Sequence, residues 1–223
     1  MRTGFDEQLE RLHSDMINMG ALCEAAINGA IDAISAGAPG TGDGEFEYAV
    51  RTVAEADAEI DRSEREIEGL CMRLLLLRSP VAGDLRKISA ALKMISDMER
   101  IGDQASDIAE IAKYIRGSEI CAAVPIAEMS HAAANMVTES VNAYVRDDTE
   151  LASAVIRADD RVDELFCRIK RDLIDILRSG DPRGEECIDM LMIAKYFERI
   201  ADHATNIAEW VEFSVTGVRG GES

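Results

Sequence analysis

A stretch of twelve residues occurs twice in this chain of 223 residues. Residues 99–110 read ERIGDQASDIAE, and 99 positions later residues 198–209 read ERIADHATNIAE. A repeated core helix would explain the shared isoleucines and alanines, but this repeat also keeps most of its carboxylates. Self-similarity at a long, fixed spacing indicates a duplicated structural unit, so we expect two related halves.

Each copy follows a segment in which apolar residues recur every seven positions. The two sets are offset by 102 positions and comprise Val53, Ile60, Ile67 and Leu74, then Val155, Val162, Ile169 and Ile176. A heptad repeat is typical of helices that pack side by side along a seam. The two offsets differ by three residues, and this difference falls in the loop between the helices, where insertions and deletions are tolerated.

The composition favours helices throughout the chain. Apolar residues make up 47% and aromatic residues 4%, which is typical of helix-on-helix packing rather than of a sandwich or barrel. Breaks rich in glycine, proline and aspartate leave six segments of helical length, at roughly 5–36, 45–78, 84–116, 125–146, 149–178 and 185–214. We therefore expect an all-α fold of two tandem, pseudo-symmetric three-helix bundles, in residues 1–120 and 121–223.

Carboxylates occupy positions in these segments where apolar residues are expected. Asp57 and Asp159 fall on the seam position next to the apolar one, and each is followed four residues later by Asp61 or Asp163. Like charges at this spacing destabilise a helix by roughly 0.2–0.5 kcal/mol. Partly buried, unpaired carboxylates would cost more or would take up protons. These acids therefore need a counter-charge.

The repeated stretch adds a second acid-bearing helix to each half. At about 100° per residue, Glu99 points within about 20° of the apolar face, and Asp103 and Asp107 follow its edge. Arg100 and Arg199 are too few to neutralise every acid. Two helices that present carboxylates to each other can bridge metal ions, and oxygen-only ligation favours Mg, Mn, Ca or ferric iron over zinc. The alternative is a solvated acidic edge paired with arginine.

The net charge of −19, from 43 acidic and 24 basic residues, argues against nucleic-acid binding because it repels phosphate backbones. A basic partner surface or bound cations would be attracted instead. No stretch approaches the roughly 20 apolar residues of a membrane span, and the first residues lack a signal-peptide pattern. Five scattered cysteines without a CxxC pair are typical of a reducing compartment, so we expect a cytoplasmic protein.

The two copies of the repeated stretch, each preceded by a helix with a D-x-x-x-D motif and a heptad seam, resemble the PhoU family. The resemblance covers nearly the whole chain. It implies an adaptor without enzymatic activity that restrains a phosphate ABC transporter. It also implies that this adaptor keeps the sensor histidine kinase of the phosphate regulon from activating starvation genes. It further implies a homodimer and bound metal, which in this family is iron, zinc, magnesium or manganese.

Ten metal ligands follow from this resemblance, five in each half. They are Asp57, Asp61, Glu99, Asp103 and Asp107, then Asp159, Asp163, Glu198, Asp202 and Asn206. Asn206 stands where the first half has Asp107, and its amide oxygen carries no charge. We therefore expect tighter metal binding in the first half.

Two other functions fit parts of the sequence. A carboxylate-bridged di-metal oxidase would need Glu-x-x-His on two helices, but the chain has one such motif, Glu128 to His131. We expect His131 and His203 at the surface and His13 without a partner. A metal-free helical adaptor would use the acidic edges to contact a basic partner. Apolar faces rich in methionine either pack in the core or contact the transporter, and they contain Met16, Met19, Met129 and Met136.

Overall fold

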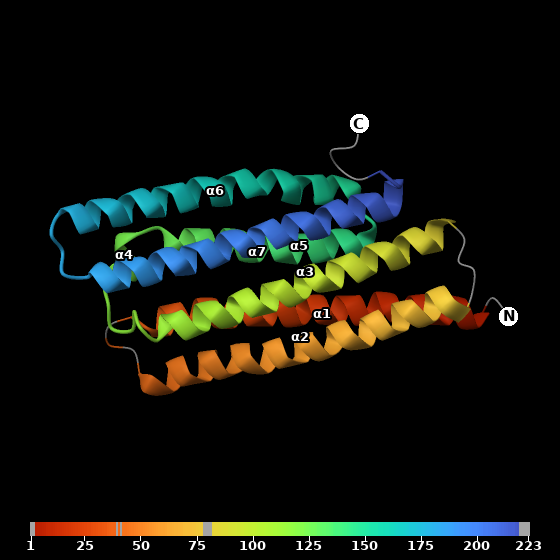
Figure 1. Ribbon diagram of the computed structural model, residues 1–223, viewed down its shortest axis with the longest axis horizontal. Helices are drawn as coiled ribbons and strands as arrows, with labels where there is room; N and C mark the ends of the chain where they lie inside the picture. The colour runs from red at the N-terminus through yellow and green to blue at the C-terminus, as the bar shows by residue number, and fades with distance from the viewer. Residues whose placement is uncertain (1–2, 39, 41, 78–81, 219–223) are drawn as a thin grey trace.

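The computed structural model describes residues 3–38, 40, 42–77 and 82–218. Within these residues it contains seven helices and no strand (Figure 1). The helices are α1 (Thr3–Ala36), α2 (Asp43–Leu77), α3 (Ala82–Ala112), α4 (Ile120–Ala123), α5 (Ile126–Arg146), α6 (Thr149–Arg178) and α7 (Gly184–Thr216). The prediction of an all-α fold is confirmed.

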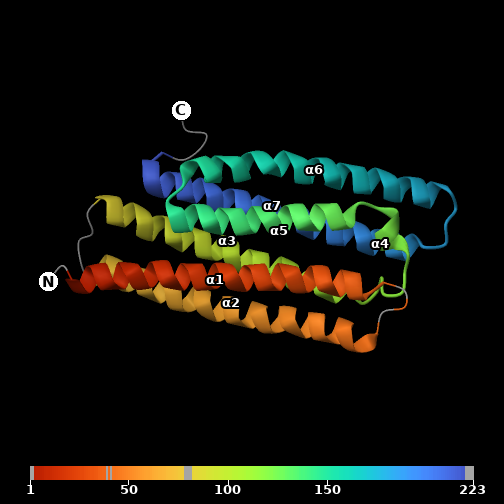
Figure 2. The same cartoon turned by 180° about the vertical axis from the view of Figure 1, so that it is seen from behind.

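The six long helices form two bundles of three, α1–α3 and α5–α7, which lie side by side (Figure 1, Figure 2). Within each bundle every helix packs on the other two. Between the bundles, α3 packs along α7, and α1 packs along α5. The predicted pair of tandem three-helix bundles is confirmed. The repeated stretch lies on α3 and α7, the central helices that join the two halves.

The heptad seam is buried, which explains how α2 and α6 are held against their bundles. The exposed fraction of Val53, Ile60, Ile67 and Leu74 is at most 1%. Their equivalents on α6 are also buried, except Ile176 near the end of the helix, which is half-buried. Packing of an amphipathic face is the main source of helix stability in proteins, so this seam holds the acids of α2 and α6 in register.

The methionine faces lie in the core. All four side chains are buried, namely those of Met16, Met19, Met129 and Met136. Methionine is unbranched and fills irregular space between helices well. The alternative that these methionines contact the transporter is therefore wrong.

The connection between the halves differs from the plain loop predicted for residues 117–125. The helix α3 ends at Ala112, earlier than predicted, and Gly117 then turns the chain with a φ of 78°. The short helix α4 follows because Ile120 is buried and the Ser118 hydroxyl accepts a hydrogen bond from its N–H at 3.1 Å.

Two predicted boundaries fall in or near these connections. The limit placed between residues 120 and 121 lies inside α4. The predicted end of the second segment at residue 78, with part of the break at 79–84, lies outside the described residues.

Candidate metal centres in two acidic clusters

Six carboxylates of α2 and α3 form a group that we call the first acidic cluster: Asp57, Asp61, Glu64, Glu99, Asp103 and Asp107. All six residues are partly buried. Burial raises the pKa of Asp57, and the carboxylates of Asp103, Asp61 and Asp107 raise it further. Burial also raises the pKa of Glu99, with added repulsion from Asp103. The acids of the two helices therefore lie within electrostatic reach of each other.

Asp57 packs against the backbone of α3 at Gly102. A Cβ atom at Gly102 would lie 3.0 Å from Oδ1 of Asp57, so the missing side chain makes room for this carboxylate. The hydroxyl of Ser106 forms a hydrogen bond with the same carboxylate, which lowers its pKa against the larger rise from burial. Two residues of the repeated stretch thus hold an acid from the neighbouring helix.

Arginine neutralises only part of the first acidic cluster. Nη1 of Arg100 lies 2.9 Å from Oδ2 of Asp103, and its Nε lies 3.3 Å from Oε2 of Glu99. Such exposed ion pairs contribute roughly 0–1 kcal/mol each. Among the residues that the structure describes, neither Asp57 nor Glu64 has a basic group within ion-pair distance. The arginine-paired edge considered from the sequence therefore accounts for some of these acids only.

The second acidic cluster consists of Asp159 and Asp163 on α6 with Glu198 and Asp202 on α7. Asp159 and Glu198 are partly buried, whereas Asp163 and Asp202 are exposed. Burial raises the pKa of Asp159 to about 6, with repulsion from Asp202 as the next cause. Lost hydration and repulsion from Glu198 likewise raise the pKa of Asp202.

The residues of α7 next to Asp159 differ from those of α3 next to Asp57. Ala201 stands where the first half has Gly102, so a methyl group takes the place of the gap. The Oγ1 atom of Thr205, the equivalent of Ser106, is buried and has no hydrogen-bond partner in the described part of the chain. Asp159 therefore lacks the hydroxyl contact that its equivalent receives.

A lysine adds positive charge to the second acidic cluster. Lys195 forms an ion pair with Glu198, and its Nζ lies 5.4 Å from the ring centre of Phe166. Phe166 occupies the place of Glu64 in the repeat, and Lys195 that of Ser96. The second cluster thus has two acids fewer than the first, and Lys195 adds a base at a position where the first half has a serine.

The residues at 107 and 206 face the opposite half as well as their own. The Asn206 amide donates a hydrogen bond to Oδ1 of Asp97 on α3 at 3.1 Å, and His203 Nδ1 lies 2.9 Å from the same oxygen. The carboxylate of Asp107 forms a hydrogen bond with Tyr196 on α7. The expectation that His203 lies at the surface is wrong, because the packing of α7 against α3 covers its ring.

The donor chemistry of both clusters fits a hard cation, since every donor is an oxygen atom. The positions of these atoms are less suited to one. Within the described residues, no three His, Cys, Asp or Glu side chains lie close enough to hold a metal ion together. Several carboxylates would have to adopt other rotamers to converge on an ion. The ten ligands and the identity of the metal remain predictions.

The other histidines do not extend these clusters. His131 is exposed, as predicted, and the Glu128 carboxylate of the same motif forms an ion pair with Arg161. His13 has a partner after all, since its ring centre lies 5.1 Å from that of Tyr144. The single Glu-x-x-His motif therefore carries no further metal ligands with it.

Four residues that matter for these clusters are missing from the sequence-based set: Glu64, Ser106, Asp97 and Tyr196. Glu64 falls on the seam position of Asp57, and the hydroxyl at position 106 is kept as threonine in the second copy. Both signals were available in the sequence. The contacts of Asp97 and Tyr196 cross between the halves, and no periodicity within one helix reports such contacts.

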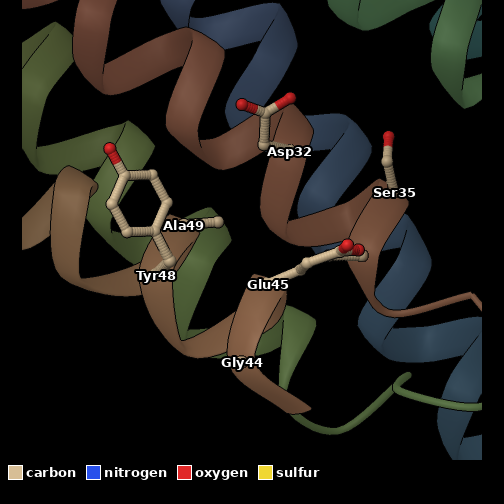
Figure 3. Close-up of a pocket in the computed structure, with 7 residues that line it drawn as sticks. Asp32, Ser35, Gly44, Glu45, Tyr48 and Ala49 are labelled. Carbon is tan, nitrogen blue, oxygen red and sulfur yellow. The ribbon is translucent and has the colours of Figure 1, made fainter. Parts of the chain in front are cut away.

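A pocket of about 530 Å³ lies apart from both clusters, between the end of α1 and the start of α2. Its lining includes Asp32, Ser35, Glu45 and Tyr48, with Asp32 and Glu45 on facing helices (Figure 3). No residue of either acidic cluster lines it, so it is separate from the candidate metal centres.

None of the described helices is long and apolar enough to cross a membrane. A family model described as the PhoU domain matches the chain twice, at residues 16–112 and 126–211. Each match spans most of one three-helix bundle and contains one copy of the repeated stretch. The chain belongs to the PhoU family.

Individual PhoU proteins resemble this chain over nearly its whole length. The phosphate-specific transport system accessory protein PhoU homolog of Clostridium acetobutylicum is 33% identical over 215 residues, 96% of this chain and 94% of the relative. Its counterpart in Synechocystis sp. is 36% identical over 224 residues, 98% of this chain and 94% of the relative. The crystal structure of PhoU from Pseudomonas aeruginosa superposes with a TM-score of 0.85 at 32% identity, covering 96% and 100% of the two chains.

Proposed function

We propose that this PhoU protein is a cytoplasmic, metal-binding adaptor between a phosphate ABC transporter and a sensor histidine kinase, and that it represses the phosphate-starvation response. The observation that carries the proposal is the likeness along both halves to relatives named phosphate-specific transport system accessory proteins. An accessory protein acts through the surface it offers to its partners, so we propose that this protein has no enzymatic activity. From the family resemblance we further propose that it is a homodimer.

The two acidic clusters support the metal-binding part of the proposal. Burial, and then repulsion by neighbouring carboxylates, raises the pKa of Asp57 and Asp159, and a bound cation would favour their charged forms. The first acidic cluster would bind a cation through Asp57, Asp61, Glu99, Asp103 and Asp107. The second would use Asp159, Asp163, Glu198 and Asp202 with the amide oxygen of Asn206. A bound iron, manganese, magnesium or zinc ion would supply the positive charge that these motifs lack.

The arrangement of the helices suggests how the clusters would affect a partner. Within the described residues, α2 and α6 pack mainly inside their own bundles. Much of each of these two helices is therefore left to solvent. The acids of each cluster lie partly on α2 or α6 and partly on α3 or α7. The net charge of a cluster, with or without a cation, would therefore set the charge on the exposed surface of α2 or α6.

Deleting the gene tests the regulatory role. Alkaline phosphatase, or another output of phosphate starvation, is measured in phosphate-rich medium. We expect high output in the deletion strain and low output after return of the wild-type gene. An output that stays low in the deletion strain would contradict the proposed role.

Complementation with point variants tests whether the acidic clusters matter. Asp57→Asn with Asp103→Asn removes two charges from the first acidic cluster, and we expect incomplete repression. Glu47→Gln is the matched control, because Glu47 is an exposed acid of α2 outside the cluster, and we expect full repression. Equal repression by both variants would show that the first acidic cluster is not needed for repression.

Purified protein tests the metal itself. Protein prepared without chelators should contain more metal per chain than a chelator-washed sample, as measured by elemental analysis. Equal metal contents would contradict metal binding. Oxygen consumption by the metal-loaded protein would instead support the di-metal oxidase.

A further inference from the structure

The interface between α3 and α7 contains two reciprocal polar contacts. Positions 97 and 196 are equivalent in the repeat, and so are positions 107 and 206. Asp97 on α3 accepts a hydrogen bond from Asn206 on α7, and Tyr196 on α7 forms a hydrogen bond with Asp107 on α3. Each half therefore lends one side chain to position 107 or 206, the equivalent positions of the other half's repeated stretch. We call these pairs the cross-half contacts.

The cross-half contact of Tyr196 acts on a member of the first acidic cluster. Asp107 is close enough to Asp57 and Asp103 for their carboxylates to repel one another. A carboxylate can only accept a hydrogen bond, so the Tyr196 hydroxyl is the donor and the Asp107 carboxylate is the acceptor. The positive charge of Arg199, also on α7, lies within reach of Asp107. The opposite half thus provides Asp107 with a hydrogen-bond donor, Tyr196, and a nearby positive charge, Arg199.

The contact on the other side has the same consequence for Asn206. Its amide nitrogen is committed to Asp97, and His203 approaches the same Asp97 oxygen. With its NH₂ group held by α3, the amide oxygen of Asn206 is the atom left for a ligand role. The side chains of Asp97 and His203 are 16% and 19% exposed, so little water competes for this contact.

We propose that Tyr196 is a positioning residue for the first acidic cluster, because it fixes the Asp107 carboxylate from the opposite half. Asp97 does the same for Asn206. The proposal rests on the proposed metal binding by the clusters. Its consequence is that neither cluster is complete within one three-helix bundle, so cation affinity depends on how the two bundles pack together.

The chemistry of ligand positioning gives the expected size of the effect. A hydrogen bond to one carboxylate oxygen fixes the rotamer and leaves the other oxygen free to coordinate a cation. Loss of such an outer partner usually lowers metal affinity about 10–100-fold. The Tyr196→Phe change removes only the hydroxyl and keeps the ring between the helices.

The test uses the full chain carrying Asp159→Asn and Asp202→Asn, so that the first acidic cluster alone binds Mn²⁺. Isothermal titration with Mn²⁺ should give about tenfold weaker binding after Tyr196→Phe. Tyr114→Phe is the matched control, because Tyr114 is 73% exposed, and its affinity should equal that of the parent.

A double-mutant cycle with Asp107→Ala separates positioning from general packing. If Tyr196 acts through Asp107, Tyr196→Phe should have no further effect once Asp107 is alanine. A loss that persists in the Asp107→Ala chain, or Tyr196→Phe affinity within twofold of the parent, would overturn the inference. A parent that binds no Mn²⁺ would instead overturn the metal role itself, and this inference with it.

Discussion

The two acidic clusters lie on equivalent pairs of helices but differ in net charge. In the first, Asp57 rests against Gly102 and receives a hydrogen bond from Ser106. In the second, a methyl group stands at Ala201, and the hydroxyl of Thr205 has no partner in the described part of the chain. Substitutions as small as glycine to alanine and serine to threonine thus change how an acid of the neighbouring helix is held.

The comparison also shows that duplication preserved the helices better than the charges. Glu64 is replaced by Phe166, Asp107 by Asn206, and Ser96 by Lys195, which pairs with Glu198. All three changes lower the negative charge of the second cluster. Because a cation site depends on uncompensated carboxylates, the two clusters should differ in affinity even though their helices are equivalent in the repeat.

Removal of the central acid of each cluster should have the largest effect. Asp103→Ala should weaken the tighter Mn²⁺ site by at least about 100-fold, the upper end of the effect of losing an outer partner. Asp202→Ala should leave that site intact and remove the weaker one. Isothermal titration of both variants checks this. Equal losses of Mn²⁺ in the two variants would contradict the difference between the clusters.

Exchanging the small residues beneath the acids should sharpen the comparison. Gly102→Ala places a Cβ atom 3.0 Å from Oδ1 of Asp57, so the carboxylate must move and Mn²⁺ affinity of the first acidic cluster should fall about tenfold. Alanine has a higher helix propensity than glycine by about 1 kcal/mol, so unfolding need not become easier. Ala201→Gly is the reciprocal variant and should leave the first cluster unchanged. Unaltered Mn²⁺ affinity in Gly102→Ala would show that the packing of Asp57 against Gly102 does not affect metal binding.

The pH dependence of stability should identify the strained acid of the second cluster. The pKa of Asp159 is about 6 in the folded protein and about 3.9 in an unfolded chain. The unfolded chain therefore releases this proton first, and the folded state loses stability as pH rises from about 4 through 6. Metal-free Asp159→Asn protein should escape this loss and be more stable at pH 7 by several tenths of a kcal/mol.

Urea unfolding in the presence of a chelator, at pH 4.5 and pH 7, measures that difference. Glu47→Gln, which changes an exposed acid outside both clusters, should follow the wild type at both pH values. A stabilisation by Asp159→Asn that is as large at pH 4.5 as at pH 7 would argue against ionisation of Asp159 as its cause.

Removing the lysine of the second cluster should give the smallest effect. Lys195→Met breaks a partly exposed ion pair with Glu198, which is worth a few tenths of a kcal/mol. Mn²⁺ affinity at the second cluster should rise about threefold, since one carboxylate is released. A fall in affinity would mean that Lys195 supports the site rather than competing with a cation.

The sequence predicts the fold well because the fold depends on repeated, local patterns. The heptad of Val53, Ile60 and Ile67 identifies the buried face of α2, and the constant offset to α6 identifies the duplication. Short connections then leave few alternatives to two adjacent three-helix bundles. The early end of α3 does not follow from local patterns, because the N–H of Gly117 donates a hydrogen bond to the carbonyl of Gly37, which is distant in sequence.

The candidate site was predicted less completely, for a physical reason. Acids on one helix face, such as Asp57 and Asp61, are visible in the sequence as exceptions to an apolar pattern. Contacts between the halves leave no such exception, since Asp97 and Tyr196 are chemically unlike although they occupy equivalent positions. The burial of His203 likewise does not follow from its own helix, because it depends on the packing of α3 against α7.

The most direct test is a titration of metal-stripped wild-type protein with Mn²⁺ by calorimetry. The clusters differ in the number of carboxylates, in the residues that contact the α2 or α6 carboxylate, and in the presence of Lys195. We therefore predict two binding steps of unequal affinity. The tighter step should disappear in Asp103→Ala. Two equal steps, or no binding of Mn²⁺, would contradict the account of two related but unequal metal centres.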